Sequence, residues 1–155
     1  MERKESIGKA LGKVVSGLYI VTSQKENIKT GFTASFLIQT SFEPPIIIVA
    51  IKKGRKFYDF ISDTKIFTVN IMPKSEMKLI GKFANPNVTE EELFNNVDYK
   101  EINNMPVINS SVSYLSCKVI NNVESGDHII VMGEVFDGEL LNDIEPAYHV
   151  RKNGF

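Results

Sequence analysis

Five hydroxyl side chains stand between residues 30 and 45, in a segment flanked by runs typical of β-strands. They are Thr30, Thr33, Ser35, Thr40 and Ser41, and the segment closes on Pro44-Pro45. Hydroxyls and backbone amides can hold a phosphate and a sugar-like chain, and the prolines fix where the next strand begins. A second polar turn, Ser125-Gly126-Asp127-His128, carries a titratable imidazole. Together the two segments predict a bound nucleotide-like cofactor that faces His128.

A basic loop places four cations around a glycine, after one predicted strand and before a predicted helix. Its sequence is Lys52-Lys53-Gly54-Arg55-Lys56. Helix amides and a guanidinium fork both favour an anion at such a junction. A solvated basic turn is the simpler interpretation of this loop taken alone. Because the hydroxyl-rich segment lies one strand away, the two together favour a phosphate site.

Three further positions each have a structural and a functional interpretation. Phe83 follows Met77 and Ile80 at helical spacing, which is typical of a core position, although an aromatic ring there could also cover a cofactor edge. Cys117 lies in an alternating strand pattern, which predicts a buried and inert thiol. The polar, basic tail of residues 148–155 is typical of a frayed terminus.

Length and composition indicate one globular domain, because the chain has 155 residues of which 43% are hydrophobic. The 18 basic and 19 acidic residues nearly cancel, so no nucleic-acid or membrane partner is expected. The charged first residues, with no apolar run behind them, predict no signal peptide. One cysteine and two histidines allow neither an internal disulfide nor a cysteine-rich zinc site, so no metal site is expected. A cytoplasmic location is the expectation.

Hydrophobic periodicity predicts more strand than helix. Strands are expected at residues 18–23, 28–36, 46–51, 66–71, 112–121 and 128–136, with the last two forming a long hairpin. Helices are expected near residues 6–15, 56–62, 74–83 and 89–95, the last with a capping-box pattern at Thr89 and Glu92. Hairpins without regular strand and helix alternation favour an antiparallel barrel over a doubly wound sheet.

Common nucleotide motifs are absent from the sequence. Residues 8–13 resemble a phosphate loop, but the glycines are too close together and Val14 replaces the magnesium-binding hydroxyl. No G-x-G-x-x-G follows a predicted strand. A nicotinamide dinucleotide is therefore expected to bind transiently, as a substrate, and not as a permanently bound cofactor.

Several landmarks, in this order and at this spacing, resemble the flavin reductase-like proteins with an FMN-binding split barrel, over nearly the whole chain. The landmarks are residues 17–22 (GLYIVT), 31–35 (GFTAS), 40–45 (TSFEPP), 67–71 (FTVNI), 126–128 (GDH) and 133–135 (GEV). The tail pattern His-x-Arg-Lys-x-Gly most resembles the flavin reductase module of diflavin flavodiiron proteins. It is also similar to the flavin module that precedes rubredoxin in some anaerobes' electron carriers.

The resemblance implies a mainly β fold, a six-stranded antiparallel Greek-key split β-barrel with a few short flanking helices. It further implies a homodimer that binds FMN near the subunit interface and takes hydride from NADH or NADPH. By position, it implies that His128 acts near the nicotinamide and that cofactor-binding residues are Thr33, Ala34, Ser35, Thr40, Ser41, Lys53, Arg55, Lys56, Phe83, Arg151 and Lys152. Phe57 stands where many members have a phosphate-binding threonine, so phosphate binding is expected to depend on cations. Phe36 and Phe57 are also expected to narrow the site against a larger FAD tail.

Three functions follow from these observations. The first is an NAD(P)H-dependent flavin reductase, which passes electrons through the flavin to free flavin, oxygen, a metal chelate or a redox carrier protein. The second is an FMN-binding electron-transfer module that a protein partner reduces, without nicotinamide activity. The third is a barrel used only for protein interaction, which would make the hydroxyl-rich segment and the basic loop coincidences.

Overall fold

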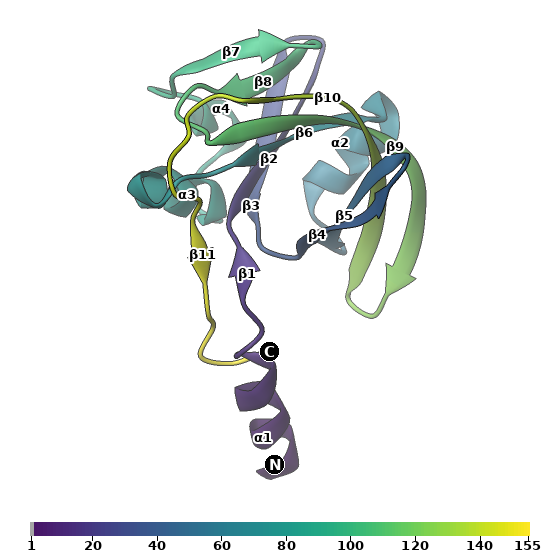
Figure 1. Cartoon of the computed structure of the whole chain (residues 1–155), viewed down its shortest axis with the longest axis vertical. Helices are drawn as coiled ribbons and strands as arrows, with labels where there is room; N and C mark the ends of the chain where they lie inside the picture. The colour runs from purple at the N-terminus through teal and green to yellow at the C-terminus, as the bar shows by residue number, and fades with distance from the viewer. Residues whose placement is uncertain (1) are drawn as a thin grey trace.

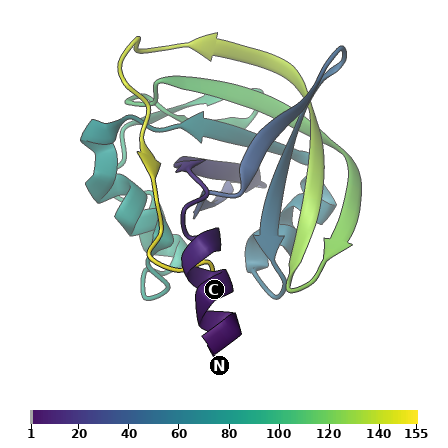
Figure 2. The ribbon, with the colours of Figure 1, turned by 60° about the horizontal axis from the view of Figure 1, so that its bottom comes forward.

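The computed structural model describes residues 2–155 and is built around a seven-stranded antiparallel sheet (Figure 1). Its strand order is β3-β2-β6-β9-β10-β5-β4. The strands are β2 (Tyr19–Lys25), β3 (Ile28–Ala34), β4 (Leu37–Phe42), β5 (Pro45–Lys52), β6 (Ile66–Ile71), β9 (Ser113–Ser125) and β10 (His128–Leu140). The sheet curls strongly, as Figure 2 shows, but β3 and β4 remain its two edges and are not paired with each other. The expected mainly β, antiparallel fold is confirmed, with an open barrel.

Two small sheets flank the main one. The hairpin of β7 (Tyr99–Ile102) and β8 (Met105–Ile108) covers one end of the sheet, and β8 is buried throughout. At the other end, β1 (Ser16–Gly17) pairs with β11 (Tyr148–His149), so the start and the end of the chain run side by side (Figure 1). This pairing positions the C-terminal tail, which the sequence alone suggested would be frayed.

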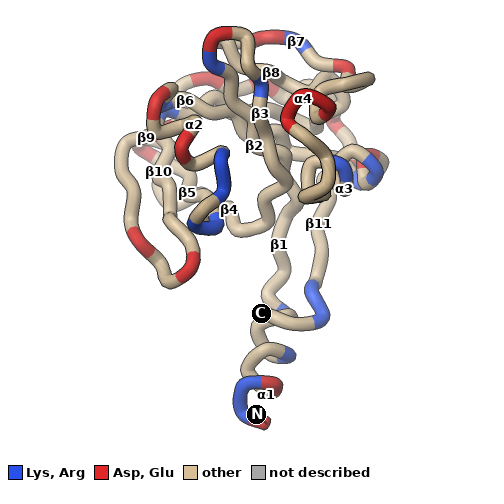
Figure 3. The backbone as a smooth tube through the Cα atoms, turned by 180° about the vertical axis from the view of Figure 1, so that it is seen from behind, with Lys and Arg blue, Asp and Glu red and all other residues tan. Residues whose placement is uncertain are grey.

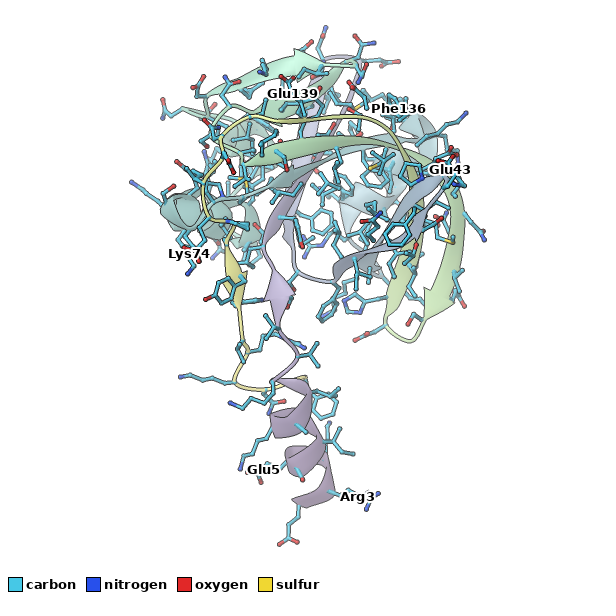
Figure 4. The ribbon with its side chains drawn as sticks, viewed as in Figure 1. Arg3, Glu5, Glu43, Lys74, Phe136 and Glu139 are labelled. Carbon is cyan, nitrogen blue, oxygen red and sulfur yellow. The ribbon has the colours of Figure 1, made fainter. Side chains whose placement is uncertain are left out.

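Short helices fill the connections. They are α1 (Glu2–Leu11), α2 (Lys56–Thr64), α3 (Met77–Ala84) and α4 (Glu90–Leu93), with a 3-10 turn, η1 (Lys74–Glu76), before α3. The capping box at Thr89 and Glu92 is confirmed, since each side chain bonds the backbone amide of the other residue. Helix α1 projects from the body, with Arg3 and Glu5 pointing away from it (Figure 4).

Alternating burial along the strands builds the core. In β5, Ile47, Val49 and Ile51 are buried while the residues between them are partly exposed, which is the period expected of a sheet covered on one face. These side chains pack with Phe57 and Ile61 of α2. A second cluster packs α3 and α4 against the N-terminal part of β2. The contacts of Phe57 and Ile61 in the first cluster fix α2 against the sheet, with its first turn at the end of β5.

The structure corrects three predicted boundaries. The helix expected to run to Val15 ends at Leu11, and it begins at Glu2, where acidic residues in the first turn and a Glu5–Lys9 ion pair support it. The strand expected at residues 28–36 ends at Ala34, and β4 was not predicted because its polar Gln39-Thr40-Ser41 stretch is typical of a turn. The chain leaves β3 at Ser35-Phe36 to form a separate edge strand. Among residues 2–155, no helix combines the length and the apolar composition that crossing a membrane requires.

Candidate functional site

A small cavity of about 160 Å³ lies where β3, the start of α2 and the end of α3 meet. Its lining includes Thr30, Gly31, Phe32, Arg55, Lys56, Phe57, Phe83, Asn85, Pro86, Val88, Glu90 and Leu93. Three residues of the predicted site, Arg55, Lys56 and Phe83, are therefore brought together. The basic segment before α2 appears in blue in Figure 3. We call this cavity the basic pocket.

Arg55 gives the basic pocket its positive charge. Its guanidinium lies over the ring of Phe32, with 4.8 Å between Cζ and the ring centroid. Burial lowers the pKa of Arg55 from its ordinary value, because the cation loses hydration. Arg55 is also the N-cap residue of α2, and because its side chain has no acceptor, no side-chain hydrogen bond caps this helix start. A partly desolvated guanidinium beside the amides of a helix start is a favourable setting for a phosphate.

Close packing of β3 against α3 shapes the other wall of the basic pocket. A Cβ atom at Gly31 would lie 2.9 Å from the carbonyl oxygen of Val21 and 3.1 Å from the ring of Phe83, so a side chain there would push the wall apart. Phe83 is 4% exposed, and its ring meets Phe94 edge-on at 5.4 Å. It therefore belongs to the core and also lines the basic pocket, and its contact with a cofactor edge stays a prediction.

A second group of side chains gathers around Phe36, after the end of β3. The ring of Phe36 lies 5.5 Å from the imidazole of His128, centroid to centroid, with a tilt of 54°. Arg151 lies over the same ring, with 5.0 Å between its Cζ and the centroid. We call these three residues the Phe36 cluster. They come from the β3–β4 connection, the start of β10 and the C-terminal tail.

The turn before β10 contacts the basic loop. His128 is opposite Lys52 in the β5–β10 register, and the backbone amide of Lys53 donates to the carbonyl of Asp127 at 2.9 Å. The imidazole Nδ1 is 2.7 Å from Asp127 Oδ1, and this hydrogen bond lowers the pKa of the Asp127 carboxyl. The carboxylate orients the ring, which keeps its Nε2 available to another group.

The C-terminal tail packs against α1, and this packing positions Arg151 in the Phe36 cluster. The amide of Gly154 donates to the carbonyl of Gly8 at 2.7 Å, and a Cβ at Gly12 would lie 2.7 Å from the carbonyl oxygen of Arg151. Arg151 Nε is buried and has no hydrogen-bond partner within residues 2–155. Such a donor is costly unless an acceptor meets it, so a ligand acceptor at the Phe36 cluster would be favoured.

The remaining predicted residues are placed as follows. Thr33 donates its hydroxyl to the carbonyl of Ile80 at 2.6 Å, so it ties β3 to α3. The Ala34 side chain is packed in the core at 3% exposure. Ser35 is half-buried beside Phe36. Thr40 and Ser41 lie at a bulge near the β4–β5 turn, toward the far end of β4 from Ser35.

Two of the predicted cations lie outside both the basic pocket and the Phe36 cluster. Lys53 forms an ion pair with Glu124, at 3.4 Å. Lys152 is exposed where the tail passes α1. Residues that the sequence did not assign to the site are Phe32, which supports Arg55, and Glu90, which was interpreted as a solvated helix start. The expected inert thiol is present, since Cys117 is fully buried and burial raises its pKa to about 12.

Comparison with known proteins identifies the family of this chain. Residues 11–154 match the family described as the flavin reductase like domain. A ferric-chelate reductase (NAD(P)H) of Archaeoglobus fulgidus is 30% identical over 152 residues, covering 94% of this chain and 90% of that protein. The structure of flavin reductase PheA2 is 27% identical with a TM-score of 0.80, covering 92% of this chain and 94% of the other.

A second kind of relative is much longer than this chain. Diflavin flavoprotein A 1 of a Synechocystis species is 32% identical over 149 residues, which cover 94% of this chain but only 26% of that protein. The chain thus spans about a quarter of such relatives. The family expected from the sequence landmarks is confirmed. The chain belongs to the flavin reductase like domain family.

Proposed function

We propose that this domain binds FMN and acts as an NAD(P)H-dependent flavin reductase. The observation that carries the proposal is the basic pocket, because Arg55, Lys56 and the open first turn of α2 converge on a space of phosphate size. A bound flavin would supply the ring that accepts hydride. Support for the nicotinamide comes from the relative named a ferric-chelate reductase (NAD(P)H).

The hydrogen-bond donors of the basic pocket and of the Phe36 cluster suit a flavin mononucleotide that extends from one to the other. Arg55 and Lys56 would neutralise the phosphate, as expected in a site without the phosphate-binding threonine. The backbone of Ala34 and the hydroxyl of Ser35 lie in the chain segment between the basic pocket and Phe36, where a ribityl chain would pass. The buried Arg151 Nε would meet an acceptor near Phe36.

His128 is the residue proposed to act on the nicotinamide. Its ring is held from one side by Asp127 and rests against Phe36, and its side chain is 25% exposed. The free ring nitrogen can therefore hydrogen-bond an incoming carboxamide or stabilise negative charge that develops beside it. Phe36 excludes water from one side of the imidazole, which strengthens both interactions.

We also propose an oligomeric state and an electron acceptor for this domain. A homodimer is supported by exposed apolar side chains just beyond α1 and on β4, since Val15 is 62%, Ile38 63% and Phe42 89% exposed. A redox carrier protein as acceptor and a cytoplasmic location remain predictions. The alternative, an electron-transfer module reduced by a protein partner, is favoured by relatives in which this domain is a quarter of a diflavin flavoprotein.

Flavin binding tests the phosphate assignment directly. Titration of the apoprotein with FMN and with riboflavin, followed by fluorescence quenching, separates the phosphate contribution from that of the ring. Arg55→Ala is expected to weaken FMN binding by roughly 10- to 100-fold, because it removes a partly buried charge partner of the phosphate. Riboflavin binding should change little, and Lys118→Ala, an exposed lysine on β9, should leave both affinities unchanged. Equal losses for FMN and riboflavin would contradict a phosphate at Arg55.

A further inference from the structure

Glu90 lines the basic pocket and also lines the two cavities that share residues with it. One of these, of about 390 Å³, lies between the end of β2 and α2, and the other, of about 520 Å³, lies between β3 and α4. All three cavities have Glu90 in their lining, and the basic pocket shares Lys56 with the first of them. A ligand that extends beyond a phosphate bound in the basic pocket would therefore pass the Glu90 carboxylate to enter either of the two neighbouring cavities.

A hydrogen bond from Thr30 of β3 holds the Glu90 side chain in position. Thr30 is 3% exposed, and its hydroxyl donates to Glu90 Oε1 at 3.2 Å. Glu90 is also the first residue of α4, directly after the capping-box residue Thr89. The Glu90 carboxylate is thus held in place at this junction by its backbone and by its side chain.

The larger spaces beyond Glu90 are acidic. In the cavity near α2, Lys25 and Lys56 face four carboxylates, which belong to Glu26, Asp59, Asp63 and Glu90. Lys25 is already paired with Asp63 at 2.9 Å. In the cavity near α4, Lys29 faces Glu90 and Glu91. Positive charge is thus concentrated in the basic pocket, and a second phosphate outside it would meet negative charge in both directions.

We propose that Glu90 makes this domain selective for FMN over FAD. The basic pocket can neutralise one phosphate, whereas the second phosphate of FAD would lie beside the Glu90 carboxylate. Because like charges at short range repel, the adenylate part of FAD would lose more affinity there than its contacts could return. This inference rests on the proposed function, since it assumes that the basic pocket holds the flavin phosphate.

The test is a comparison of FMN, FAD and riboflavin affinities in the wild-type chain and in Glu90→Gln. The wild type should bind FMN more tightly than FAD, and Glu90→Gln should shrink that preference by about tenfold, because one screened repulsion is removed. Riboflavin affinity should stay the same. Glu90→Lys should shift the preference further toward FAD, and Glu101→Gln, an exposed carboxylate of β7, should leave it unchanged.

Two outcomes would overturn the inference while leaving the proposed function intact. One is a wild type that binds FAD as tightly as FMN. The other is an unchanged FMN-to-FAD ratio in both Glu90 variants, with melting temperatures like that of the wild type. A chain that binds none of the three flavins would instead overturn the proposed function.

Discussion

Arg151 lies over the ring of Phe36, with 5.0 Å between the guanidinium carbon and the ring centroid. The two residues are far apart in sequence, and the pairing of β1 with β11 brings them together. The Phe36 ring also lies next to the imidazole of His128. The C-terminal tail is therefore a structural part of the candidate site.

Removal of the Arg151 side chain should weaken flavin binding. Arg151→Ala loses the cation over Phe36 and its buried Nε, and we expect FMN affinity to fall by about tenfold, which is typical of a single charge-assisted contact. Fluorescence titration measures this change, and Lys100→Ala on β7 is the control because it is exposed and belongs to the distant hairpin. Wild-type affinity in Arg151→Ala would show that the tail does not contribute to the site.

Substitution of His128 should separate hydride transfer from flavin binding. His128→Ala is expected to lower the rate of NADH-dependent flavin reduction by roughly 100-fold, in the range of a lost general acid or orienting group. Bound FMN should remain, because the phosphate is held elsewhere. Asp127→Asn keeps a partner for the imidazole and should cost less. Stopped-flow absorbance measures both variants, and unchanged reduction kinetics in His128→Ala would remove this residue from the mechanism.

The sequence was most informative where local signals and tertiary packing agree. The strand at residues 46–51 and the capping box at Thr89 depend on neighbours along the chain, and both were predicted. The basic loop was placed beside the hydroxyl-rich segment for the same reason, because a strand and a helix start on either side fixed its geometry.

Contacts between distant segments could not be read in this way. Nothing near Arg151 in the sequence indicates that it will meet Phe36, since that contact depends on the close approach of Gly12 to the tail. Glu90 was interpreted as part of a solvated helix start. Its hydrogen bond to Thr30 could not be predicted, because the two residues are 60 positions apart in the sequence. Strand β4 was missed because its polar residues face solvent at a sheet edge, where no apolar alternation is needed.

The single thiol gives a prediction of pH dependence. Burial raises the pKa of Cys117 to about 12 from an ordinary value of 9.0, so the thiolate is suppressed in the folded chain. A thiol reagent at pH 8 should label the native protein slowly and the urea-unfolded protein at once. Through this group, stability should be fully present below pH 9 and should fall as pH rises toward 12, because the unfolded chain loses the proton first. Rapid labelling of the native chain at pH 8 would contradict the buried position.

The central claim is that the chain holds a flavin that a nicotinamide reduces. An anaerobic visible spectrum of the protein reconstituted with FMN, recorded through stepwise addition of NADH and then NADPH, tests it most directly. The account predicts that FMN stays with the protein through gel filtration and that its absorbance bleaches with at least one of the two dinucleotides. A retained flavin that neither dinucleotide bleaches would support the electron-transfer alternative, and a protein that retains no flavin would contradict the account as a whole.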